Sequence, residues 1–226
     1  MIDSTPDKVV VAEGAERDMR KRILGAAFKT FTEKGYTGAN TVEIATLAKV
    51  SKRDLYAEFG SKQGTLVACI ESWTAGMGLS QELPTPRNRT MLATTLANFG
   101  SNLLKEVSQP VVTAMYRLAI AEAKRSPEVA RVLESAGRGA SRKALADLLA
   151  RAAAVGILEA EEPSEMAEQY LALLWEGLRV SLLMGLVDAP EPAEIERRAQ
   201  KATLAFLRLH PEPSSEERPT SRTPAP

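Results

Sequence analysis

The sequence is poor in the residues that most catalytic and metal sites need. Its 226 residues include one cysteine, Cys69, and one histidine, so no internal disulfide forms and a Cys–His or zinc site would need distant partners. A GxxxxGK[ST] phosphate loop is absent. There is also no long apolar run and no apolar signal-peptide core. We therefore expect a cytoplasmic protein that is not an enzyme, with no cofactor, no metal and no membrane association.

The net charge of zero hides an uneven distribution. Residues 17–62 contain ten Lys and Arg against five Asp and Glu, whereas the rest of the chain contains nineteen against twenty-four. A basic N-terminal segment on an acidic body is expected of a nucleic-acid binder, because Lys and Arg displace counterions from phosphates. An excess of this size also arises by chance, so charge alone leaves DNA binding open.

Apolar residues recur with a period near 3.6 along almost the whole chain, and no segment alternates as a strand would. The predicted fold class is all-α. Three helices are expected to begin near Arg17, Asn40 and Ser51, and a fourth to run from Ser61 to about Met77. Five more are expected near 88–106, 109–125, 127–155, 163–187 and 190–209. Gly35 should end the first helix, and Gly137 and Gly139 should bend the 127–155 helix.

The segment 40–62 has the layout of a helix-turn-helix. Asn40 or Thr41 caps a short helix, with Glu43 at capping-box spacing from Asn40, and Ser51 caps the next helix, with Asp54 at the same spacing. Apolar residues then face inward, so the second helix presents an outer face that can enter the major groove of DNA. The alternative is an ordinary pair of capped helices in a bundle. The residues predicted on this outer face are Lys52, Arg53 and Tyr56.

The stretch GYTGANTVEIATLAKVSKRDLYAEFGSKQGTLVACI closely resembles the N-terminal region of the TetR family of transcriptional regulators. In that family a Gly–aromatic pair ends the first helix, a capped helix containing Ile-Ala follows, and VSxxxLYxxFxSKxxL comes next. The likeness covers roughly residues 20–70. It rests on Gly35, Tyr36, Ile44, Ala45, Val50, Ser51, Leu55, Tyr56, Phe59, Ser61, Lys62 and Leu66.

This resemblance implies roles for individual positions. Asn40 or Thr41 would contact a phosphate, and Lys62 would meet the DNA backbone. Ser51 would begin the recognition helix, which carries the three outer-face residues. We expect Arg53 to read a base, because a guanidinium bonds the O6 and N7 atoms of guanine. Tyr56 either holds a phosphate or packs partly in the core.

The sequence also departs from the family pattern. Lys49 stands where the family usually has glycine, so either it adopts a positive φ at a cost of about 1 kcal/mol or the turn differs. Asp54 either only caps its helix or also accepts a hydrogen bond from cytosine. Glu58 is expected to face away from DNA. A basic cluster opens the first helix and either reaches DNA or forms a solvated face; it consists of Arg17, Arg20, Lys21 and Arg22.

Residues 88–209 resemble the family more loosely, with RLAIAEAKRSPEVARVLESAG similar to its AefR-like branch. The resemblance implies a domain that dimerises through its last two long helices and holds an effector between the others. The 163–187 helix carries a stripe of small residues, Gly177, Ser181 and Gly185. The 190–209 helix carries an apolar stripe, Ile195, Ala202, Phe206 and Leu209. We expect these two helices to form a homodimer; the alternative is that they pack inside one subunit.

Candidates for an effector pocket are aromatic and methionine side chains, together with two arginines that lie in apolar stretches. For each aromatic or methionine residue, plain core packing is the favoured explanation and a ligand wall the alternative. Each arginine, if buried, needs either an anionic effector or a partner such as Glu122 or Glu176. The candidates are Trp73, Met77, Phe99, Met115, Tyr116, Arg117, Tyr170, Trp175 and Arg179.

The sequence therefore predicts a flexible arm at 1–16, a helix-turn-helix domain at 17–62, a helical effector-binding and dimerisation domain at 63–210, and a disordered tail at 211–226. We expect a homodimeric repressor that binds a pseudo-palindromic double-stranded DNA operator and is released by a small apolar or amphipathic effector. The alternative is a DNA-binding regulator of the same fold without an effector, controlled by a protein partner or acting architecturally.

Overall fold

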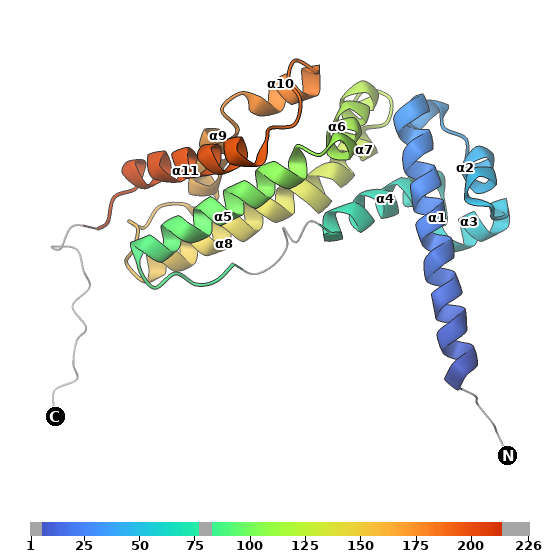
Figure 1. The fold of residues 1–226 in the computed structure, drawn as a ribbon, viewed down its shortest axis with the longest axis horizontal. Helices are drawn as coiled ribbons and strands as arrows, with labels where there is room; N and C mark the ends of the chain where they lie inside the picture. Colours follow the sequence, from blue (N-terminus) through green and yellow to red (C-terminus); the bar gives the residue numbers. More distant parts are fainter. Residues whose placement is uncertain (1–5, 77–82, 214–226) are drawn as a thin grey trace. The chain divides into compact units, whose positions relative to one another are not determined.

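The computed structural model describes residues 6–76 and 83–213, and every regular element within them is helical (Figure 1). The all-α class predicted from periodicity is confirmed. The chain divides into two compact units: Met1–Met77 with Ala114–Gly137, and Gly78–Thr113 with Arg138–Pro226. Across the described ranges, no helix combines the length and apolarity needed to span a membrane.

The first unit is built around α1 (Pro6–Gly38), which packs against α2 (Thr41–Ala48) and α4 (Lys62–Gly76). The short α3 (Lys52–Phe59) contacts α2 and α4. Side chains from α6 (Pro110–Glu122) and α7 (Pro127–Leu133) complete the core. Each large apolar side chain buried there contributes about 1.5–3 kcal/mol. The fully buried members include Ile23, Ala27, Phe31, Ile44, Leu55 and Val129.

The first helix is longer than the apolar pattern indicates. It begins at Pro6 and not at Arg17, so residues 6–16, expected to form a flexible arm, are helical; residues 1–5 lie outside the described residues. The prediction relied on apolar periodicity, which a helix needs only where it packs, and proline is well tolerated in a first turn. At the other end, Gly35 interrupts the helix as predicted, with φ 73° and ψ 167°.

The second unit contains α5 (Arg89–Val107), α8 (Gly139–Ala154), α9 (Pro163–Trp175), α10 (Leu178–Met184) and α11 (Pro192–Leu209). Figure 1 shows α11 running beside α5 and α9. Tyr170 lies at their centre, where its hydroxyl donates to the Leu96 carbonyl at 2.6 Å. Its ring centroid lies 6.4 Å from Phe99 and 5.7 Å from Phe206. Burial raises the pKa of Tyr170 to about 12, so the phenol remains neutral.

Two long helices predicted in this region are broken. The 127–155 helix becomes α7, a π-helical turn η1 (Glu134–Arg138) and α8, so the irregularity falls at the two glycines that were expected to bend it. The prediction of one continuous helix over 163–187 is wrong, because Glu176 (φ 37°) and Gly177 (φ 81°) both adopt left-handed backbone between α9 and α10. Gly177 and Gly185 cap the two ends of α10 and do not form a stripe on one long helix.

A polar clamp that the sequence pattern did not reveal holds the end of α11. Arg89 donates to the carbonyls of Ile157 at 3.2 Å, of His210 at 2.7 Å and of Leu207. His210, which lies beside the predicted tail in the sequence, is buried, with Nδ1 3.0 Å from Glu161 and Nε2 2.7 Å from Gln169. The clamp thus satisfies carbonyls that a helix C-terminus leaves without intrahelical partners.

The close packing at Tyr170 generates a stability prediction. A Cβ atom at Gly100 on α5 would lie 2.4 Å from the Tyr170 hydroxyl oxygen and 3.0 Å from Leu174 Cδ1. Gly100→Ala should therefore destabilise the protein by about 1–3 kcal/mol, measured by urea unfolding. Gly25→Ala on α1 is the control: nothing lies within 4 Å of its Cβ, and it should stabilise by about 0.5–1 kcal/mol. Equal stability of Gly100→Ala and the wild type would contradict this packing.

Candidate nucleic-acid interface

The turn between α2 and α3 is closed by backbone geometry. Lys49 adopts φ 56° and ψ 45°, so of the two alternatives for this non-glycine position the structure has the positive φ. Its N–H donates to Thr46 at 3.1 Å, and the N–H of Val50 donates to Ala45 at 3.0 Å. These bonds satisfy carbonyls at the end of α2 in the manner of a left-handed C-cap. The direction in which the chain enters α3 is thereby fixed.

A reciprocal capping box starts α3. The N–H of Asp54 donates to Ser51 Oγ at 3.0 Å, and the N–H of Ser51 donates to Asp54 Oδ2 at 3.1 Å. Ser51 Oγ also bonds the same carboxylate oxygen at 2.7 Å. The hydroxyl bond, followed by the backbone bond, holds the pKa of Asp54 below its usual value. The predicted capping role is confirmed; its contact with cytosine stays a prediction.

The outer face of α3 carries the three residues that the sequence placed there. Lys52, Arg53 and Tyr56 are exposed, while Leu55 on the opposite side is fully buried. Tyr56 is 38% exposed, and its hydroxyl lies 3.2 Å from Thr41 Oγ1, which joins α3 to the start of α2. The Lys52 ammonium lies 5.5 Å from the Tyr56 ring centroid. A basic, partly aromatic surface therefore stands on the side of α3 opposite the core.

The N-terminus of α2 distinguishes its two candidate residues. Asn40 is exposed and caps the helix, its Oδ1 accepting from the N–H of Val42 at 2.9 Å. Thr41 is only 8% exposed and its hydroxyl faces Tyr56. The capping box expected between Asn40 and Glu43 gives way to an ion pair, in which Glu43 lies 2.6 Å from Lys34. Asn40 is thus the more accessible of the two for a phosphate.

Lys62 lies against the end of α1 and is half-buried. Its ammonium donates to the carbonyl of Thr37 at 3.3 Å and lies 4.7 Å from the Tyr36 ring centroid. Burial lowers the pKa of Lys62, and the Glu122 carboxylate partly offsets this. A phosphate would therefore meet a cation that is already positioned by the protein.

The remaining acid of α3 is satisfied inside the protein. Glu58 pairs with Arg20 of α1, whose guanidinium also lies 5.0 Å from the Phe59 ring centroid. Arg20 therefore helps to hold α3 in position. At this residue the basic cluster of α1 makes contacts within the protein and is not simply a solvated face. The ion pair with Arg20 also compensates the negative charge of Glu58.

The proposed effector residues that the structure describes are divided between the two units. Met115 is buried and Tyr116 half-buried in the first unit, whereas Phe99 and Tyr170 are buried in the second. The side chain of Trp73 and the whole of Met77 lie outside the described parts of the chain.

The two candidate arginines also have different surroundings. Arg117 is exposed on α6, so the need of a buried guanidinium for an anionic partner does not arise there. Arg179 is half-buried and lies 5.5 Å from the Trp175 ring centroid. A guanidinium stacked on an indole is stabilised without an effector anion.

The sequence did not identify Glu122 as a functional candidate. Glu122 appeared in the sequence only as a possible arginine partner, but its carboxylate bonds Thr37. No local pattern signals a contact between residues 85 positions apart in the chain.

A capped helix pair with an exposed basic face on a helical body defines a helix-turn-helix DNA-binding regulator. The model of bacterial regulatory proteins of the tetR family matches residues 23–69, and that of the AefR-like transcriptional repressor C-terminal domain matches residues 94–210. The chain belongs to the TetR family of transcriptional regulators, with an AefR-like C-terminal domain. It is thus a regulator and not an enzyme.

Individual relatives agree with this assignment. The Flavonoid-responsive Regulator FrrA is 31% identical, with 88% of this chain and 99% of that chain covered and a TM-score of 0.73. A TetR transcriptional regulator from Agrobacterium tumefaciens is 28% identical over 85% and 95% of the two chains, with a TM-score of 0.72. The HTH-type transcriptional repressor NicS of Pseudomonas putida is 42% identical over 62 residues. That match spans 27% of this chain and 29% of NicS.

The capping box provides a test of how α3 is held. Ser51→Ala should destabilise the protein by about 1 kcal/mol, because the first turn loses its side-chain acceptor, and Ser51→Asn should restore most of the loss. Urea unfolding of the three proteins checks this. The folded-state pKa of Asp54 is lowered, so its contribution is present near neutral pH and is lost as the pH falls through that pKa. A Ser51→Ala protein as stable as the wild type at neutral pH would contradict the capping role.

Proposed function

We propose that this regulator is a repressor that binds operator DNA through α3. The observation that carries the proposal is the exposed face of Lys52, Arg53 and Tyr56 on a helix whose other side is anchored by Leu55. Arg53 reads a guanine edge, Lys52 adds positive charge, and Tyr56 orients toward phosphate. NicS is a repressor by name and is 42% identical to this chain over 62 residues, which supports the direction of regulation.

Backbone contacts flank this reading helix. Asn40 at the start of α2, Ser51 at the start of α3 and Lys62 at the start of α4 mark three helix N-termini. Free N–H groups and the positive end of the helix dipole favour phosphate at such positions. Residues 17–62 then act as the DNA-binding head, with 63–210 as the effector and dimerisation domain.

DNA binding is tested first on DNA from the region upstream of the protein's own coding sequence, across a range of salt concentrations. Arg53→Ala should lose about 1–3 kcal/mol of discrimination between operator and unrelated DNA. Lys62→Ala should weaken binding to all sequences and make the salt slope about one unit shallower. Lys143→Ala, which removes an exposed lysine of α8 paired with Asp147, is the charge-matched control and should change neither quantity. Specific binding that is unaffected by Arg53→Ala would exclude α3 as the reader.

A homodimer would place two reading heads on one operator, about 34 Å apart. Three members of the apolar stripe predicted for the last helix, Ile195, Ala202 and Phe206, are buried within the subunit, whereas the fourth, Leu209, is 60% exposed. Other large apolar side chains are exposed on α10, on the segment directly after it and on α11. They are Val180, Met184, Leu186, Val187 and Leu204, with exposures between 45% and 69%.

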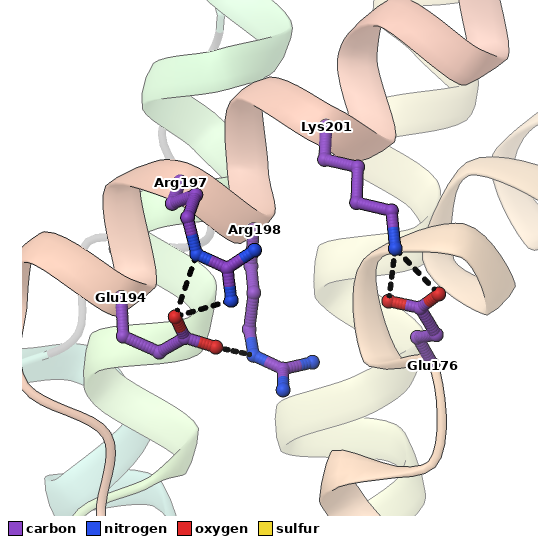
Figure 2. Close-up of polar contacts among 5 residues, drawn as sticks. All are labelled: Glu176, Glu194, Arg197, Arg198 and Lys201. Carbon is purple, nitrogen blue, oxygen red and sulfur yellow. Dashed lines mark hydrogen bonds and ion pairs between the residues drawn. The ribbon is translucent and has the colours of Figure 1, made fainter.

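Charged residues also lie on α11 and at the end of α9. Figure 2 shows Lys201 of α11 bonded to both carboxylate oxygens of Glu176, at 2.7 and 2.9 Å. On the same helix Glu194 lies between Arg197 and Arg198 and bonds both. An apolar patch with a charged rim is the usual composition of a protein interface. We therefore assign the dimer contact to the outer faces of α10 and α11.

The dimer assignment predicts the effect of a charge in this patch. Leu204→Glu should convert the dimer to monomers, or raise its dissociation constant at least tenfold, in sedimentation experiments, because it buries an unpaired charge. Ile120→Glu is the matched control: Ile120 is 61% exposed on α6, outside the patch, and its variant should remain dimeric. Unchanged dimerisation of Leu204→Glu would place the interface elsewhere.

The effector is assigned to the class of small amphipathic aromatic molecules. FrrA is flavonoid-responsive by name and resembles this chain over most of both lengths. A flavonoid series is therefore the first to add to the protein–DNA complex. Release of DNA by an effector requires that it bind the non-binding conformation more tightly. A complex that no such compound dissociates would favour the alternative regulator, controlled by a protein partner.

A further inference from the structure

Glu122 lies at the end of α6, well outside residues 23–69 that match the DNA-binding family model, yet its carboxylate bonds the end of α1. Oε1 accepts from the backbone N–H of Thr37 at 3.2 Å, and Oε2 accepts from the Thr37 hydroxyl at 2.8 Å. Glu122 is 6% exposed. The hydroxyl bond is the main cause that lowers the pKa of Glu122, so it remains ionised near neutral pH. Both oxygens are thus occupied by one residue of the DNA-binding head.

The backbone at Gly35 makes this contact possible. Its φ of 73° turns the chain after the main run of α1, and a Cβ there would lie 3.0 Å from Glu122 Oε1. Any other residue would combine an unfavourable backbone conformation with a crowded contact. Glycine at this position therefore permits the approach of the carboxylate as well as the kink.

Thr37 in turn holds Lys62. The Thr37 carbonyl accepts from the Lys62 ammonium at 3.3 Å, and the preceding residue, Tyr36, places its ring centroid 4.7 Å from the same nitrogen. Thr37 therefore donates its N–H and its hydroxyl to Glu122, and its carbonyl accepts from Lys62. Loss of the carboxylate would leave the Thr37 N–H without this acceptor and free the segment that positions the lysine.

We propose that Glu122 is a positioning residue for DNA binding: through Thr37 it fixes the Lys62 ammonium where it meets a backbone phosphate. The inference rests on the proposed role of Lys62 in binding phosphate. It goes further because a residue of α6, beyond the matched head, sets the strength of a DNA contact without touching DNA itself.

The test is a double-mutant cycle on the full chain, with Glu122→Ala, Lys62→Ala and the double variant binding the same operator DNA at several salt concentrations. Glu122→Ala should weaken binding about three- to tenfold and flatten the salt slope by up to one unit. In the Lys62→Ala background the same change should have no further effect. Glu122→Gln, which keeps an acceptor for Thr37, should lie between the wild type and Glu122→Ala.

A merely structural role would give a different cycle, because Glu122→Ala would then lower affinity equally in both backgrounds. Removal of a repelling negative charge would instead raise affinity in both. Either result overturns the inference, as does an unchanged affinity. If Glu122→Ala does not fold by circular dichroism, Thr37→Val replaces it, since it removes only the hydroxyl bonded at 2.8 Å; the same pattern with a smaller effect is expected.

Failure of the proposed function is recognised separately. If neither Arg53→Ala nor Lys62→Ala alters DNA binding, the assignment of the DNA-contacting residues fails, and the inference fails with it. If Lys62→Ala flattens the salt slope but Glu122→Ala does not act through it, only the inference is wrong.

Discussion

The DNA-binding surface depends on the burial of Leu55, which anchors the inner face of the eight-residue helix α3. A helix this short is not stable alone, because nucleation costs more than a few hydrogen bonds return. Leu55 fixes its inner face, the Ser51 box fixes its start, and the Lys49 turn fixes the direction from which it is entered. With those three restraints, the outer face needs no apolar residues and is available for basic ones.

The acidic residues that lie among the basic ones do not argue against DNA binding, because they bond groups within the protein. Asp54 caps α3, Glu58 pairs with Arg20, and Glu43 pairs with Lys34. Each of these carboxylates has a partner within the head, so local charge counts understate the positive character of the outer face. Glu122 extends this internal use of acids to α6, where its partner is an uncharged threonine.

The body uses its large side chains mainly for packing. The Tyr170 hydroxyl bonds the Leu96 carbonyl and its ring packs between Phe99 and Phe206, so two of the effector candidates, Phe99 and Tyr170, belong to one core with Phe206. Left-handed backbone at Glu176 and Gly177 then separates α9, which is buried against its neighbours, from α10, which exposes apolar side chains. The break divides internal packing from the proposed dimer contact.

The sequence by itself determined the all-α class, the helix-turn-helix and the capping role of Asp54, because periodicity and caps are properties of neighbouring residues. It did not determine the start of α1, the break at Glu176 or the exposure of Arg117. Only the tertiary structure decided these, and only it joined Thr37 to Glu122 and buried His210 beside Glu161. Such contacts link residues far apart in the chain, and whether a left-handed turn or a polar bond forms depends on partners that no local pattern specifies.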